Sequence, residues 1–391
     1  MHVLYWAFLC GLFVACAYGE NKSQRRLTTA ERIALTGRRS EVHFVTTDDG
    51  YVLTVFRIPG TRGPILLMHG ILDTSDTWVL RGNNSLAMTL ANLGYDVWLG
   101  NCRGNYYSKD HVKLNATSDA EVYWNFSFHE IGYYDLPATI DLVLKKTGVE
   151  KLNTIGHSQG TTIFFVMGSL RPEYNDKVNV LLALAPVAYL QNVPPPLSLI
   201  IKVAPELVAA LTLVKQYYLL GDSPSGEVTR SICNNPLHGY PVCAYGVVFP
   251  IVGTDAEEYT PAIHYEAFNY YPDNGSVKTL DHFAQVSLRR QFAQYDNGPL
   301  DNLKLYGTTS PPKYDLSKVK MPVALLCGAN DKLSTLDDVA LLRAALPNVI
   351  QYTVLNRKRA NHVDLVWGKT MEKYLFPDIL EILTRYENVR K

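Results

Sequence analysis

The sequence has no excess of charge of either sign. Its 391 residues contain 37 Lys and Arg against 37 Asp and Glu, so the formal net charge is zero. A nucleic-acid-binding protein usually carries a strongly basic surface, and this balance argues against such a partner. Glycine and proline, at 26 and 21 residues, are not in excess, while 47% of the residues are hydrophobic. These proportions exclude collagen-like, coiled-coil and wholly disordered chains.

Long hydrophobic runs are missing except at the start of the chain. Val3 to Val14 is almost unbroken apolar sequence, and small residues follow it up to Gly19. This pattern predicts a secretory signal peptide at residues 1–19, although His2 is the sole positive candidate ahead of the run. A signal anchor is the alternative, but the run is short for a span of roughly 20 residues. No later segment is a candidate transmembrane helix, so no stable span is expected.

Cysteine is scarce, with six residues, and two of them, Cys10 and Cys16, fall in the predicted signal peptide. Of the remaining four, only Cys233 and Cys243 are close in sequence, which makes them the candidate disulfide. The other two are expected to be free thiols: Cys102 and Cys327. N-glycosylation sequons suit a chain in the secretory pathway, and we expect some of the five to carry glycan: Asn21, Asn83, Asn115, Asn125 and Asn274.

Strand patterns begin after a polar segment at residues 20–40. Two stretches, Glu41–Thr46 and Tyr51–Ile58, flank Asp48–Gly50, which predicts a β-hairpin. Short apolar runs then recur, as expected for strands of a buried parallel sheet: Ile65–Met68, Tyr95–Leu99, Leu152–Ile155, Val180–Ala185, Val323–Cys327 and Ile350–Val354. Stretches with helical spacing lie between them: Ser85–Leu93, Tyr134–Lys146, Thr161–Leu170 and Leu336–Leu346.

This alternation of strands and helices predicts an α/β protein with right-handed crossovers and a mostly parallel, doubly wound sheet. The alternation stops between Pro186 and Pro312, where aromatic clusters and amphipathic pieces such as Leu280–Gln294 occur. We therefore predict a core formed by residues 41–185 and 313–391, interrupted by a mainly helical insertion at residues 186–312.

The segment Gly156–Gly160 has the form G-x-S-x-G, between a predicted strand and a predicted helix. That context is typical of a nucleophile elbow, in which the serine lies at the apex of a strained turn and the two glycines let strand and helix approach. Ser158 is therefore the candidate nucleophile. The neighbouring His157 is expected to shape the turn.

A serine hydroxyl needs a base, and the base needs an orienting acid. His362 follows the last predicted strand and is the only histidine after His282. Asp331 follows the strand Val323–Cys327, at a carboxyl end, where ligand sites of open parallel sheets lie. The competing carboxylates fall at a predicted helix start, where capping explains them: Asp337 and Asp338.

His69-Gly70 follows the strand Ile65–Met68 and is a candidate oxyanion loop. The stabilising donors would be the backbone N–H groups of Ile71 and Gln159, the second being the residue after the nucleophile. The alternative is that His69-Gly70 is only a tight turn.

Several segments together resemble the acid lipase family of the α/β-hydrolase fold, which includes gastric and lysosomal acid lipases: Leu66–Leu72, Gly94–Asn105, Tyr134–Ala138 and Gly156–Thr162. The resemblance runs from about Glu41 to the C-terminus and is weakest in the insertion. It implies a lipid ester hydrolase with Ser158, Asp331 and His362 as catalytic triad, a helical cap formed by the insertion, and Cys233–Cys243 as the cap disulfide. It also implies no metal or organic cofactor.

Members of this family act on triacylglycerols or cholesteryl esters, so the resemblance implies a lipid ester substrate at a lipid droplet or micelle surface. The sequence departs from familiar mammalian members around Asp273–Ser276, in the cap, which leaves substrate and acyl length open. We expect a monomer in the secretory pathway, either extracellular or lysosomal. The alternatives are a carboxylesterase for short-chain soluble esters and a non-catalytic lipid-binding protein, although an intact triad argues against the second. The sequence shows no His/Cys cluster or EF-hand-type loop that predicts a metal.

Overall fold

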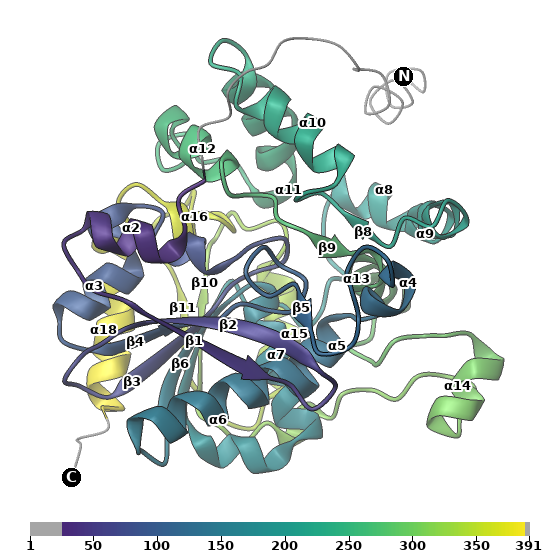
Figure 1. The fold of residues 1–391 in the computed structure, drawn as a ribbon, viewed down its shortest axis with the longest axis horizontal. Coiled ribbons are helices and arrows are strands. Elements are labelled where there is room, and N and C mark those ends of the chain that lie inside the picture. The colour runs from purple at the N-terminus through teal and green to yellow at the C-terminus, as the bar shows by residue number, and fades with distance from the viewer. Residues whose placement is uncertain (1–25, 388–391) are drawn as a thin grey trace.

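The computed structural model describes residues 26–387, so the predicted signal peptide and Asn21 lie outside the described residues. A nine-stranded sheet crosses the molecule (Figure 1), in the order β1-β2-β4-β3-β6-β7-β10-β11, with β5 paired to β2. Its strands have these bounds: β1 Glu41–Thr46, β2 Tyr51–Ile58, β3 Pro64–Met68, β4 Asp96–Leu99, β5 Asp110–His111, β6 Leu152–His157, β7 Val178–Leu184, β10 Val323–Cys327 and β11 Val349–Val354. From β4 to β11 neighbouring strands are parallel, whereas β2 pairs antiparallel with β1, β4 and β5. The predicted mostly parallel sheet is therefore present.

Helices cover both faces of the central strands because these strands are buried on both sides. Along β3, Ile65 and Leu67 pack with α3 and α18 in one core cluster, and Leu66 and Met68 pack with α6 and α7 in the other. The helices of these layers have these bounds: α2 Thr29–Leu35, η2 Ser75–Trp78, η3 Gly82–Asn84, α3 Leu86–Asn92, α4 Ala120–Tyr123, α5 Phe128–Glu130, η4 Ile131–Asp135, α6 Leu136–Thr147, α7 Gln159–Leu170, η5 Pro172–Lys177, η7 Leu316–Lys318, α15 Leu336–Ala345, α16 Asp364–Trp367, α17 Met371–Tyr374 and α18 Phe376–Arg385.

The register of the strands brings the loops after β3, β6, β10 and β11 to one edge of the sheet, the edge formed by the carboxyl ends of the parallel strands. Met68 at the end of β3 pairs with Gly156 in β6, and Leu184 at the end of β7 pairs with His157. On the far side, Cys327 at the end of β10 pairs with Val354 at the end of β11. The loops that carry Ser158, Asp331 and His362 consequently leave the sheet at the same edge.

The segment between β7 and β10 is mainly helical and includes a small two-stranded sheet. Most of it lies above that edge, whereas α14 extends away at the lower right (Figure 1). Its elements have these bounds: α8 Leu197–Lys202, α9 Ala204–Leu213, β8 Tyr218–Leu219, α10 Pro224–Cys233, η6 Tyr240–Val248, α11 Phe249–Val252, α12 Pro261–Phe268, β9 Gly275–Ser276, α13 Val277–Arg289 and α14 Pro299–Tyr306. We call this segment the cap. Phe249 and Tyr259 of the cap belong to the same core cluster as α16 to α18, so the cap packs directly on the core.

Two local sequence predictions differ from the structure. The polar segment 20–40 contains a helix, α2, which begins with a capping box between Thr28 and Glu31. The amphipathic helix expected at Leu280–Gln294 ends earlier, at Arg289, because Arg290 adopts a left-handed conformation with φ of 54°. The hairpin predicted at Asp48–Gly50 is present, since β1 and β2 pair antiparallel on either side of it.

Candidate active site

Ser158 lies in the sharp turn between β6 and α7, with φ of 54° and ψ of −121°. Such a conformation is strained for a residue with a side chain and is typical of functional sites. The flanking glycines make the turn possible: a Cβ on Gly156 would lie 2.6 Å from the carbonyl oxygen of Gly160, and a Cβ on Gly160 would overlap the carbonyl oxygen of Met68. This is the local geometry of a nucleophile elbow.

Three predicted site residues form one hydrogen-bonded chain. Ser158 Oγ lies 2.8 Å from His362 Nε2, and His362 Nδ1 lies 2.8 Å from Asp331 Oδ2. The other carboxylate oxygen of Asp331 accepts backbone N–H groups of the loop that follows it, both at 2.8 Å: Leu333 and Ser334. Because the carboxylate can only accept, it places the proton of the neutral imidazole on Nδ1 and leaves Nε2 free to accept from the serine hydroxyl.

The two competing carboxylates lie elsewhere. Asp337 is exposed at the start of α15. Asp338 is buried, but its oxygens accept backbone N–H groups of Gln191 and Asn192 at 3.2 and 3.1 Å. Asp338 therefore attaches the loop between β7 and α8 to α15, a contact that helix spacing alone could not indicate.

The loop after β3 passes directly beside the nucleophile. A Cβ on Gly70 would lie 3.3 Å from Ser158 Cβ and 3.2 Å from His157 Nδ1, a tight fit that a glycine avoids. In the described part of the chain, the backbone N–H groups of Ile71 and Gln159 have no protein hydrogen-bond partner, and Gln159 is the first residue of α7. Both donors are thus available near the nucleophile, and the helix N-terminus adds positive potential.

His69 holds this loop in place. Its Nε2 accepts the backbone N–H of Cys102 at 3.1 Å, and its Nδ1 lies 2.8 Å from the carbonyl oxygen of Gly70. The ring is therefore neutral with its proton on Nδ1, and burial lowers the pKa of His69 to about 4. His69 acts on the loop through its side chain, which the sequence pattern did not indicate.

His157 lies next to His362, the candidate base. Its Nε2 lies 2.9 Å from the backbone carbonyl oxygen of His362, and the two rings are 5.0 Å apart. Burial, together with the neighbouring His362, lowers the pKa of His157 to about 3. The ring is consequently neutral and donates through Nε2, so His157 holds the backbone of His362 in place.

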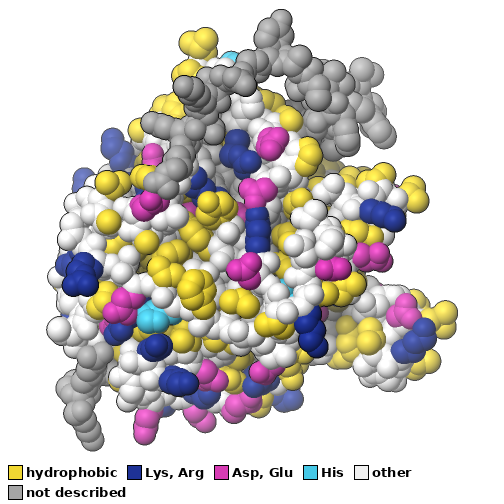
Figure 2. All heavy atoms as spheres, in the orientation of Figure 1, with side chains coloured by type: hydrophobic (Ala, Val, Ile, Leu, Met, Phe, Trp, Pro, Cys, Tyr) yellow, Lys and Arg dark blue, Asp and Glu magenta, His cyan; other side chains and the backbone are white. Residues whose placement is uncertain are grey.

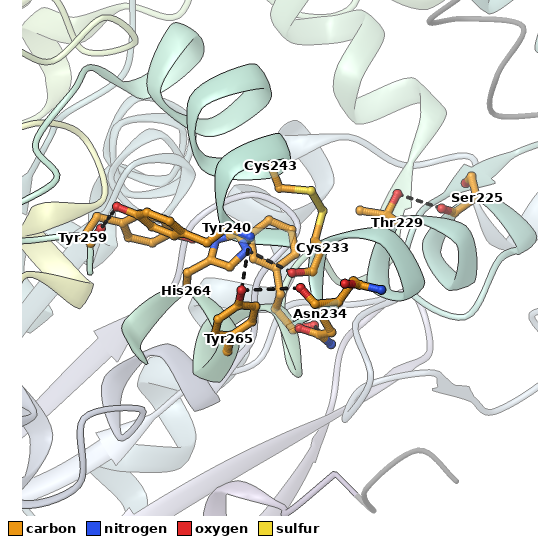
Figure 3. Close-up of a disulfide and its surroundings, with 11 residues drawn as sticks. Ser225, Thr229, Cys233, Asn234, Tyr240, Cys243, Tyr259, His264 and Tyr265 are labelled. Atoms are coloured by element: carbon orange, nitrogen blue, oxygen red, sulfur yellow. Dashed lines mark hydrogen bonds between the residues drawn. A yellow bond between two sulfur atoms is a disulfide. The ribbon is translucent and has the colours of Figure 1, made fainter. Parts of the chain in front are cut away.

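Cys233 and Cys243 form a disulfide, with their Cα atoms 5.5 Å apart. It joins the end of α10 to η6 in the cap (Figure 3). His264 Nε2 lies 3.0 Å from the carbonyl oxygen of Cys233, and Tyr259 OH lies 3.1 Å from His264 Nδ1. The disulfide is thus tied through His264 to the layer of the cap that packs on the core. Cys102 and Cys327 are free and buried.

The sequons differ in their exposure. Three lie at exposed positions: Asn83, Asn115 and Asn125. Asn274 is only 7% exposed, its Oδ1 accepts the backbone N–H of Asp222 at 3.0 Å, and its Nδ2 points to Asp273 Oδ1. The atom that would carry a glycan at Asn274 is therefore enclosed.

Residues 26–387 contain no group of three or more His, Cys, Asp or Glu side chains placed to hold a metal ion. Within that same range, no helix is long and apolar enough to cross a membrane.

Two family models match the sequence. A partial alpha/beta-hydrolase lipase region matches residues 29–82, and the alpha/beta hydrolase fold matches residues 63–230. Among curated proteins, Lipase 1 of Drosophila melanogaster is 39% identical over 370 residues, covering 93% of this chain and 81% of that protein. Human gastric triacylglycerol lipase is 33% identical over 377 residues, covering 92% and 91%. Human lipase member K is 32% identical over 394 residues, covering 96% of both chains.

A solved thermophilic esterase from Thermogutta terrifontis has a similar fold, with a TM-score of 0.52 at 13% identity, covering 89% of this chain and 100% of the other. The predicted α/β-hydrolase fold is confirmed by the family model and by this structure.

Proposed function

This chain belongs to the acid lipase family of α/β hydrolases and is an ester hydrolase, and from that premise we propose that it cleaves the ester bonds of triacylglycerols or cholesteryl esters through Ser158, His362 and Asp331. The observation that carries the proposal is the hydrogen-bonded chain from Ser158 Oγ through both nitrogens of His362 to Asp331. A non-catalytic lipid carrier has no chemical need for this arrangement.

In the first half-reaction, His362 Nε2 takes the hydroxyl proton of Ser158 as Oγ attacks the ester carbonyl carbon. The backbone N–H groups of Ile71 and Gln159 stabilise the oxyanion. The bond to the alcohol oxygen then breaks, and His362 gives its proton to that oxygen. In the second half-reaction, water attacks the acyl-enzyme, gives a proton to His362, and releases the fatty acid while the proton returns to Ser158 Oγ. Asp331 stabilises the cationic form of His362 in both.

The cap supports a preference for long acyl chains. It is rich in apolar residues and lies above the sheet edge that carries the nucleophile (Figure 1). Each methylene moved from water into an apolar site contributes about 0.8 kcal/mol, so a chain several carbons longer gains severalfold to thousandfold in kcat/KM where it is accommodated. Measuring kcat/KM for dispersed esters from two to eighteen carbons tests this. A steady fall beyond four carbons would favour the short-chain carboxylesterase instead.

A surface of the cap supports contact with a lipid droplet or micelle. Helix α9 is mostly apolar, yet none of its residues is buried. We define the α8–α9 surface by six exposed apolar side chains: Leu199, Ile200, Val203, Leu207, Leu213 and Val214. Apolar side chains are visible over these helices at the right of the space-filling view (Figure 2). An exposed apolar patch is typical of an interaction site, and Lys202 and Lys215 beside it suit a surface that collects fatty acid anions.

The surface has a matched test. Leu207→Asp combined with Leu213→Asp should lower adsorption to a triacylglycerol emulsion, and hydrolysis of that emulsion, at least tenfold. Turnover of a soluble butyrate ester should stay the same. The control carries the same changes at two exposed leucines of α14, Leu300 and Leu303, and should behave like the unchanged protein. Equal emulsion hydrolysis by both double variants would remove the α8–α9 surface from the proposal.

We further propose that the protein is a monomer of the secretory pathway, delivered outside the cell or to the lysosome. The predicted signal peptide, the exposed sequons and the cap disulfide support an oxidising compartment. Ser158→Ala tests the function as a whole: the variant should fold and be secreted while losing several powers of ten in kcat.

A further inference from the structure

The loops that carry the base and the acid contact the cap as well as the core. Three consecutive backbone carbonyls of the cap, in Val252, Gly253 and Thr254, each accept a hydrogen bond from them. The N–H of His362 donates to Val252 at 3.2 Å. Asn361 Nδ2 donates to Gly253 at 3.0 Å, and Asn330 Nδ2 donates to Thr254 at 3.0 Å. Asn361 directly precedes His362, and Asn330 directly precedes Asp331.

The base loop is built around Asn361. This side chain is fully buried, and its Oδ1 accepts the backbone N–H groups of Val363 and Asp364, both at 3.0 Å. The amide oxygen of Asn361 thus holds the turn after His362, while its amide nitrogen binds the cap. Because the carbonyl of His362 also accepts from His157 Nε2, the backbone of the base is held from the cap on one side and from the elbow on the other.

Gly253 fits between the two loops with no room for a side chain. It follows α11 with φ of 103°, a conformation that favours glycine. A Cβ at this position would overlap the carbonyl oxygen of Asn330 and lie 3.0 Å from Asn361 Cβ. The loop that carries Asp331 and the loop that carries His362 therefore both contact Gly253.

The next residues anchor the segment to the core. Asp255 is fully buried and makes a two-point ion pair with Arg357, at 2.7 and 2.8 Å. Arg357 lies in the loop between β11 and His362. Glu258 accepts the backbone N–H and the hydroxyl of Thr370 at 2.7 and 2.6 Å. These contacts fix the cap segment on the same side of the molecule as the base.

We propose that Val252–Thr254 is a positioning element of the catalytic machinery, so that the cap sets the turnover rate as well as the acyl preference. The proposal rests on the function proposed above for Ser158, His362 and Asp331. A displacement of about 1 Å in a catalytic group costs on the order of a hundredfold in rate. Disturbing this segment therefore lowers kcat, while KM for a substrate too short to reach the cap stays close to its original value.

The test compares two glycines of the insertion. Gly253→Ala should lower kcat for a soluble acetate ester by ten- to a hundredfold, with KM within twofold. Gly298→Ala is the control, because Gly298 also has a positive φ, of 86°, but nothing within 4 Å of its Cβ position. It precedes α14, which lies apart from the rest of the fold in Figure 1. Active-site titration with a phosphonate counts the competent enzyme, and the kcat of each variant is corrected for any misfolded fraction.

If Gly253→Ala does not fold, Asn330→Ala provides a second test of the proposal. It removes the hydrogen bonds from Asn330 Nδ2 to the carbonyl oxygens of Thr254, at 3.0 Å, and Arg359, at 3.3 Å, and it keeps the Asp331 side chain. A less firmly held carboxylate stabilises the imidazolium less, so the acid limb of the kcat profile should move to lower pH by a measurable fraction of a unit, with lower kcat. A purely structural role would lower the melting temperature without moving that limb.

The outcomes separate this inference from the function on which it rests. If the unchanged protein hydrolyses no ester, the proposed function fails. If it is active and Gly253→Ala matches Gly298→Ala in kcat, or Asn330→Ala leaves both kcat and the pH profile unchanged, the positioning role is overturned while the function stands.

Discussion

The Asp331 carboxylate and the His362 ring lie 2.8 Å apart, and the carboxylate is oriented by two backbone N–H groups of its own loop. Asp331→Asn would present an amide to Nδ1 and favour the wrong tautomer of the imidazole. We expect kcat to fall by several powers of ten. Asp337→Asn, an identical change at an exposed site in the next helix, should stay within twofold. Loss of activity in Asp337→Asn with a normal Asp331→Asn would reverse the assignment of the acid.

Asp73, which follows the candidate oxyanion loop, should make the protein less stable as pH rises. Burial, helped by the carboxylates of Asp76 and Asp273, raises the pKa of Asp73 to about 8. A carboxyl whose folded-state pKa is raised contributes stability that is present below its unfolded value, near 4, and is lost as pH rises towards 8. Asn imitates the protonated acid and does not titrate. Between pH 5 and pH 7, the free energy of unfolding of the unchanged protein should therefore fall by about 3 kcal/mol relative to that of Asp73→Asn.

Denaturant unfolding at these two pH values measures that difference. Asp337→Asn again serves as control, and its curve should run parallel to that of the unchanged protein. A parallel curve for Asp73→Asn as well would mean that Asp73 is ionised in the folded protein across this range.

The cap disulfide should stabilise the cap without being required for chemistry. Cys233 and Cys243 are separated by 10 residues, and closing a loop of this size contributes about 3 kcal/mol on the chain-entropy account. Replacing both by Ser should lower the melting temperature and leave turnover of a soluble short ester within severalfold. Peptide mapping without reduction should recover the Cys233–Cys243 crosslink and no Cys102–Cys327 crosslink, and finding the latter would contradict the assignment.

Glycan occupancy should follow exposure. Asn83, Asn115 and Asn125 lie on the surface, whereas Asn274 is buried and its amide nitrogen donates to Asp273 Oδ1 at 3.3 Å. Mass spectrometry of the secreted protein should find glycan at one or more of the first three and none at Asn274. An Asn274 glycan on active enzyme would show that the cap adopts another arrangement there.

The sequence indicated the sheet well because its strands have the continuous apolar character of a doubly covered parallel sheet. It also pointed to Ser158, Asp331 and His362, since each follows a recognisable strand in a fixed chain order. It failed to show how the cap meets the core. The carbonyls of Val252–Thr254 leave no trace in side-chain chemistry, and the glycine at position 253 is one of 26 in the sequence, so its positive φ became visible only in the structure.

Other contacts were missed because they depend on tertiary pairing. Asp338 was explained by its place at a helix start, and its backbone N–H does donate to the capping hydroxyl of Thr335 at 3.2 Å. Its carboxylate, however, accepts the backbone N–H groups of Gln191 and Asn192. The helix α2 could have been found from its Thr28 and Glu31 capping pair. The ion pairs of Arg26 with Asp76 and Asp273, at 2.8 and 3.1 Å, link positions too far apart in sequence for any local pattern to reveal.

The hydrogen bond between Ser158 and His362 spans 204 residues of chain, and this separation has a consequence for biosynthesis. A ribosome that adds 5 to 20 residues per second needs roughly 10 to 40 seconds to pass from the nucleophile to the base. During that time the nascent chain contains Ser158 but not His362, so its serine hydroxyl has no base. On the proposed mechanism, hydrolysis can therefore begin only after the last strand and the loop that carries His362 have emerged and folded.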